Sequence, residues 1–177
     1  MKTLKILFSA IVLLTTFSNA CLSQHAMTTY ASVTILNGIA ISETAPLNFG
    51  TMSIPNAEEN VILTTANVRT ASSPGNIELM AQSPVSQNAA YTVTGSGDAS
   101  YVIILPSNGT DTISNGLRHM DIVDFVSHPA SAGVNGLVGH LNDSGIDNFT
   151  VGATLKLETE QASGTYTGSF NISVNYN

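Results

Sequence analysis

The residues best suited to metal chemistry are two histidines and two aspartates close together in the sequence. His119 and Asp121 are two positions apart, and Asp124 and His128 follow shortly after them. A metal site needs its ligands to converge on one point. Side chains alternate between the faces of a strand, so residues 119 and 121 share one face and residues 124 and 128 the other. We therefore predict no metal site here and interpret these side chains as solvent-facing.

A second oxygen-rich stretch, residues 142–147, reads Asn-Asp-Ser-Gly-Ile-Asp. It lacks the regular spacing and the terminal glutamate of a helix–loop–helix calcium loop. We interpret it as a polar turn.

Motifs for a nucleophile or a nucleotide are missing. Ser96 lies between Gly95 and Gly97, but the spacing is not that of the Gly-x-Ser-x-Gly turn of hydrolases. Glu58 and Glu59 are adjacent, so on a strand they point apart. The sequence contains no phosphate loop and no dinucleotide fingerprint. We predict a protein that is not an enzyme, with no catalytic residue, no cofactor and no metal.

The composition predicts one all-β domain. The chain has 177 residues, of which 43% are hydrophobic and only 10% charged, so it can build a core but is poor in the charged residues of exposed helices. Its net charge of −7 argues against nucleic-acid binding, which needs a basic face. A single cysteine excludes an internal disulfide.

The N-terminus has the pattern of a secretory signal peptide. Lys2 and Lys5 precede an apolar run at residues 6–17, and small residues lie one and three positions before a cut after Ala20. The run is about a dozen residues, too short for the roughly 20 of a spanning helix. We expect export to the periplasm, the outer cell surface or the medium, with no membrane span in the mature chain.

Cys21 would be the first mature residue, the position that carries the lipid in bacterial lipoproteins. Such proteins usually have leucine at −3, where this chain has Ser18, so lipidation and an ordinary tail residue both stay open. The expected organisation is a signal peptide at residues 1–20, a short tail at residues 21–26 and one domain at residues 27–177.

Alternation with period two predicts eight to ten short strands separated by turns, which is typical of an antiparallel β-sandwich. Gly95 to Asp98 suggest a hairpin-like loop between two of the strands, and Asn37-Gly38 is a turn-prone pair or a bulge. The expected strand segments are residues 27–35 (with Ile39 and Ile41 in the same frame), 47–52, 61–68, 77–81, 91–94, 101–105, 122–126, 149–157 and 166–176.

The C-terminus carries the strongest signal. Large apolar residues alternate with Thr, Ser and Asn up to the penultimate position, which predicts a half-buried final strand. The inward face consists of Tyr166, Phe170, Ile172, Val174 and Tyr176, with Gly164 fourteenth from the end and Gly168 in register.

This ending resembles that of chaperone–usher pilus subunits and of spore coat protein U-like domains. The mature chain as a whole resembles the bacterial domain-of-unknown-function 4402 family, on residues 47–50 (Leu-Asn-Phe-Gly), residues 151–155 (Val-Gly-Ala-Thr-Leu) and the C-terminal pattern. The resemblance implies an immunoglobulin-like sandwich exported by a Gram-negative bacterium. In pilus subunits a periplasmic chaperone first supplies a missing strand, and the N-terminal extension of a like subunit then replaces it.

Residues 27–35 therefore have two interpretations. Their apolar face, Met27, Ala31, Val33 and Ile35, is either a donor strand for a neighbour or the domain's own first strand. We prefer the second, which predicts a self-complete monomer.

Three functions follow from these patterns. The leading one is a secreted, non-enzymatic β-sandwich with a structural or adhesive role at the cell surface. The alternatives are a polymerising fimbrial subunit and a small ligand- or glycan-binding module, although the chain has no Trp to stack on a sugar.

Overall fold

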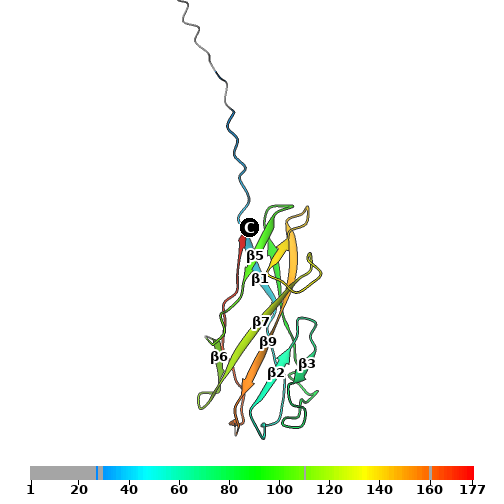
Figure 1. The fold of residues 1–177 in the computed structure, drawn as a ribbon, viewed down its shortest axis with the longest axis vertical. Helices are drawn as coiled ribbons and strands as arrows, with labels where there is room; N and C mark the ends of the chain where they lie inside the picture. The colour runs from blue at the N-terminus through cyan, green and yellow to red at the C-terminus, as the bar shows by residue number, and fades with distance from the viewer. Residues whose placement is uncertain (1–26, 28–29, 110, 160) are drawn as a thin grey trace, which may run out of the picture. The chain divides into compact units, whose positions relative to one another are not determined.

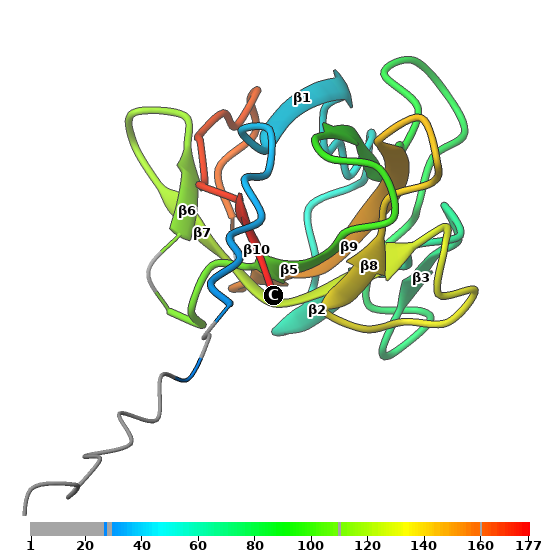
Figure 2. The same cartoon turned by 90° about the horizontal axis from the view of Figure 1, so that it is seen from above.

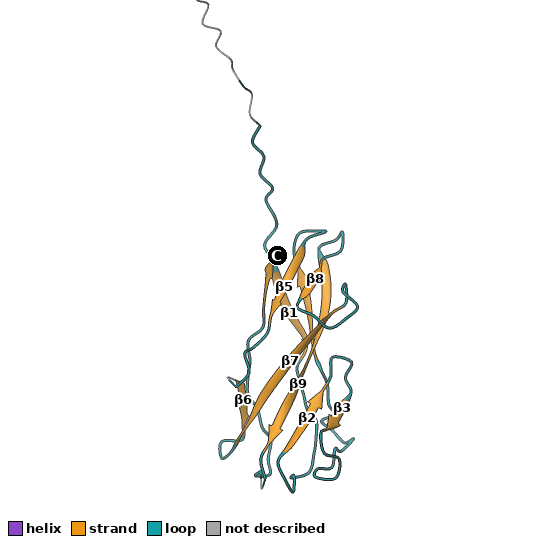
Figure 3. Ribbon diagram, in the orientation of Figure 1, coloured by secondary structure: helices purple, strands orange, loops and turns teal. Residues whose placement is uncertain are grey.

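The protein is all-β in a computed structural model, which describes Met27 and residues 30–109, 111–159 and 161–177. These residues contain ten strands and no helix (Figures 1 and 3). The chain divides after Thr34, and every strand belongs to the unit of residues 35–177. The strands are β1 (Ala40–Ala45), β2 (Glu59–Leu63), β3 (Arg69–Ala71), β4 (Ala89–Thr94), β5 (Ser100–Ile104), β6 (Asp111–Ser114), β7 (His119–Pro129), β8 (Val138–His140), β9 (Ile146–Leu157) and β10 (Ser173–Tyr176).

Two antiparallel sheets make up this unit, which confirms the predicted β-sandwich. The larger sheet has the order β1-β4-β9-β2-β3, with β7 also paired to β9 and β6 to β7. The smaller sheet has the order β10-β5-β8, and Figure 2 shows these three strands grouped together. The twelve residues of β9 pair with β4 in their first half and with β2 in their second half, so β9 organises the large sheet.

The core has two clusters that β9 links: one lies between the two sheets, and the other lies between the large sheet and the loop segments that cover it. Burial alternates along β2 and β4 as the period-two pattern predicts, because one face of each strand packs inward. One cluster centres on Tyr101 and Phe149, and the other on Leu63 and Leu155. The partly buried Leu47 packs against both clusters.

The hairpin expected around Gly95 to Asp98 is not present. β4 pairs with β1 and β9, whereas β5 pairs with β10 and β8, so this loop crosses from one sheet to the other. The strand expected at residues 61–68 ends at Leu63, because Thr64 and Val68 close a turn in which Val68 O accepts from Thr64 N. The segment at residues 77–81 contributes only a single bridge, from Leu79 to Met52.

The described part of residues 27–35 forms no strand in the structure, and both interpretations of this segment stay open. Met27 and residues 30–35 form no strand, and the first strand is β1. The side chains of Met27, Val33 and Ile35 are 84–89% exposed. Alternation shows that a segment suits a sheet, but a strand also needs an edge to pair with.

Candidate functional site

The histidines and aspartates of residues 119–128 do not gather at one point. Within the described residues no group of three His, Cys, Asp or Glu side chains could hold a metal ion. A bulge between Val123 and Val126 places Asp124 at a φ of 52°, where its backbone N–H donates to Asn108 Oδ1 at 2.7 Å. His128 Nδ1 lies 3.1 Å from Asn135 Oδ1. These polar groups are engaged in local contacts.

The oxygen-rich residues 142–147 serve the fold. Asn142 Oδ1 accepts from the backbone N–H groups of Ser144 and Ile146, each at 3.0 Å, and so shapes the turn. The buried Asp147 carboxylate accepts from Tyr101 Oη at 2.9 Å and from Ser131 Oγ at 2.6 Å. Burial and this carboxylate raise the pKa of Tyr101.

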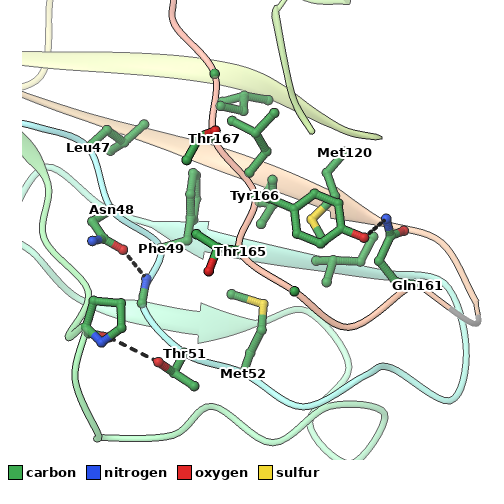
Figure 4. A pocket seen from close by; sticks show the side chains of 18 of the residues that line it. Leu47, Asn48, Phe49, Thr51, Met52, Met120, Gln161, Thr165, Tyr166 and Thr167 are labelled. Carbon is green, nitrogen blue, oxygen red and sulfur yellow. Dashed lines mark hydrogen bonds between the residues drawn. The ribbon is translucent and has the colours of Figure 1, made fainter. Parts of the chain in front are cut away.

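The domain contains a groove of about 580 Å³ (Figure 4). Residues 46–55, here called the N-terminal wall, line one side of it, and residues 161–170, the C-terminal wall, line the other. The base is apolar, and it comes from β6, β7 and β9: Ile113, Met120, Ile122, Leu155 and Leu157. The groove therefore opens directly onto the second core cluster.

Hydrogen bonds hold the N-terminal wall on the side away from the groove. Asn48 exchanges two backbone bonds with Gln87, each 2.7 Å long. The Arg69 guanidinium donates to the carbonyls of Phe49 at 2.6 Å, Thr51 at 3.1 Å and Met80 at 2.7 Å. Burial lowers the pKa of Arg69, which carries no carboxylate partner among the described residues. This arginine fixes the wall at the bend made by Gly50, whose φ is 75°.

The C-terminal wall is held in the same manner. Thr167 exchanges two backbone bonds with Ser114, at 2.9 and 3.0 Å. Tyr166 faces the groove (Figure 4). Its hydroxyl donates to Ala162 O at 2.8 Å. The buried Gln161 donates through Nε2 to Tyr166 Oη at 3.0 Å and to His119 O at 3.2 Å. This network closes one end of the groove.

Each wall contains one residue, Leu47 or Tyr166, without a backbone hydrogen bond among the described residues. Backbone groups of adjacent residues in an extended chain point in opposite directions. Asn48 and Thr167 bond away from the groove, so the backbone groups of Leu47 and Tyr166 point towards it. No backbone hydrogen bond reaches Leu47 or Tyr166 from the described residues. An apolar trough with such a residue in each wall is suited to receive one further extended segment.

The strand predicted at residues 166–176 is only partly present. Ser173–Tyr176 forms β10, and Thr167 adds a single bridge to Ser114. The large apolar residues of the predicted inward face are more buried than their neighbours, but Gly168 is exposed. Phe170 lies against Phe125 with ring centroids 5.0 Å apart, and Ile172, Val174 and Tyr176 belong to the first cluster. Gly164 adopts a φ of 146°. The sequence did not predict the opposite wall or the base, because alternation says which way a residue faces and not which neighbour is missing.

Residues 39–176 match the family described as a domain of unknown function, DUF4402. The chain belongs to this family. The DUF4402 domain thus begins one residue before β1 and ends with β10, so that residues 27–35 precede it. No curated protein and no solved structure matches the chain. The described residues form strands and loops, and they contain no helix that could cross a membrane.

Proposed function

We propose that this protein is an exported, non-enzymatic structural subunit that joins like subunits by strand addition at the bacterial cell surface. The observation that carries the proposal is the groove: an apolar base between two extended walls, in which Leu47 and Tyr166 have no backbone hydrogen bond among the described residues. A strand laid into the groove would satisfy the backbone groups of both residues and cover the base. Main-chain bonds would supply affinity, and alternate side chains would supply specificity.

The occupant we propose is the segment of residues 27–35 from a second copy. This segment alternates apolar and polar residues, as a strand with one buried face requires. Its apolar side chains have no cover among the described residues. At about 3.3 Å per residue its nine residues reach roughly 30 Å when extended, comparable to either ten-residue wall.

The expected affinity follows from the side chains that the groove would cover. Met27, Val33 and Ile35 are each at least 84% exposed, and full burial of such a side chain contributes about 1.5–3 kcal/mol. Their sum of about 5–9 kcal/mol is comparable to the cost of association, about 4–15 kcal/mol. Side-chain burial alone therefore does not guarantee a stable complex. Hydrogen bonds from the added strand to the backbone of the walls must supply the remaining free energy.

Two further parts of the proposal come from the sequence. The signal-peptide pattern supports export, and an uncovered groove favours a periplasmic chaperone that protects the apolar base until a like subunit arrives. The alternative to this proposal is a self-complete monomer, in which residues 27–35 belong to their own domain.

The test uses the mature chain from Cys21 and a chain that lacks residues 21–35. Light scattering after size-exclusion chromatography should find oligomers of the mature chain and a monomer of the shortened one. A labelled peptide of residues 27–35 should bind the shortened chain, and the same peptide with Val33→Asp and Ile35→Asp should bind at least tenfold more weakly. The proposal would be refuted if the mature chain is a monomer and the shortened chain does not bind the peptide. Binding of a small sugar or lipid in the groove instead would favour the ligand-binding alternative.

A further inference from the structure

The C-terminal Tyr176 fixes the point at which the N-terminal segment joins the domain. Its hydroxyl donates to Asn37 O at 2.6 Å and accepts from the backbone N–H of Ser96 at 2.7 Å. The N–H of Asn37 donates to Ser96 Oγ at 2.6 Å. A Cβ on Gly95 would lie 2.4 Å from the same hydroxyl, so the loop fits closely around it. We call these contacts the Asn37 latch.

The latch holds Asn37-Gly38 in a backbone conformation other than the turn that this dipeptide favours. Asn-Gly is the strongest pair for a two-residue hairpin turn, in which both residues have positive φ. Neither Asn37 nor Gly38 is among the described residues with positive φ. Both backbone polar groups of Asn37 are engaged by the latch, so a turn there would break these bonds.

A turn at Asn37-Gly38 would compete with donation between copies. It would direct the preceding residues back along β1, which pairs only with β4 among the described strands and so has a second edge to offer. Closure within one chain acts at a high effective concentration, in the millimolar range for short connections. Strand addition between copies therefore needs something that disfavours the turn.

Building on the proposed function, we propose that the Asn37 latch regulates strand addition by keeping Asn37-Gly38 extended. With the latch formed, residues 27–35 are offered to a second copy. With the latch broken, the same residues pair with their own domain, and the chain becomes a closed monomer.

The test measures the oligomer fraction of the full mature chain and three variants by light scattering. Tyr176→Phe should lower this fraction at least tenfold and yield a monomer. Gly38→Ala should assemble like the wild type, since a Cβ there meets nothing within 4 Å and the observed φ is not positive. Tyr176→Phe with Gly38→Ala should recover assembly, because alanine resists the left-handed conformation that the turn needs.

Two controls separate the latch from general destabilisation. Ser96→Ala removes the acceptor for Asn37 N–H and should act in the same direction as Tyr176→Phe. Tyr101→Phe removes a buried hydroxyl bonded to Asp147 and should lower the melting temperature without changing the oligomer fraction of the folded protein. An assembling wild type with unchanged assembly of Tyr176→Phe, or no recovery in the double variant, would overturn this inference alone. A monomeric wild type would overturn the proposed function and this inference with it.

Discussion

Replacement of Arg69 by alanine should weaken both the fold and the groove. Three carbonyls, those of Phe49, Thr51 and Met80, would lose a charged donor at 2.6–3.1 Å. A hydrogen bond to a charged group contributes about 1.5–3 kcal/mol. Arg69 is only half-buried and the three bonds share one group, so we expect a total loss of about 2–4 kcal/mol rather than the full sum.

Urea unfolding of the chain lacking residues 21–35 measures this loss, and peptide titration measures the groove. Arg118→Ala is the matched control, because it removes the same charge from an exposed side chain and should change stability by less than about 0.5 kcal/mol. Arg69→Lys should be intermediate, since one ammonium cannot reach three carbonyls in the planar geometry of a guanidinium. Equal stabilities of Arg69→Ala and Arg118→Ala would refute the role assigned to this clamp.

Three further predictions concern stability and export. Burial would raise the pKa of Glu59, but hydrogen bonds from Ser72, Asn60 and Ser73 lower it below its usual 4.5. The stability that the ionised carboxylate contributes is therefore lost as pH falls below that value. Glu59→Gln should flatten the acid limb of a profile of melting temperature against pH. Ile172→Asp should cost more than about 2 kcal/mol, whereas Asn171→Asp on the exposed face should cost almost nothing, as thermal unfolding will report. Mass spectrometry of the exported chain should give a start at Cys21, with an added acyl mass if that cysteine is lipidated; an intact Met1 would contradict export.

The fold class could be predicted because period-two burial is a local property. The runs around Val61, Tyr91 and Phe149 became strands since each puts apolar side chains on one face. The pairing partners could not be predicted in the same way. Nothing in Gly95 to Asp98 distinguishes a hairpin from a crossing between sheets, because both need the same glycine-rich turn.

The candidate site was visible from the sequence on one side only. The alternation that ends at Tyr176 indicated the C-terminal wall, and the same pattern indicated residues 27–35. The groove depends instead on a strand that is missing between distant segments, and Met120 and Leu155 appear in the sequence as ordinary core residues. The latch was equally hidden, since Asn37, Ser96 and Tyr176 are far apart along the chain.

The most direct test of strand addition between copies is a cross-link between two differently marked chains. Both would carry Cys21→Ser, one with Ala31→Cys and the other with Thr165→Cys on the C-terminal wall. After mixing and mild oxidation, we predict a disulfide-linked species with the summed mass of the two chains. A partner chain with Val134→Cys, which is exposed and does not line the groove, should give none. Equal yields with Thr165→Cys and Val134→Cys, or no cross-link with either, would contradict the account.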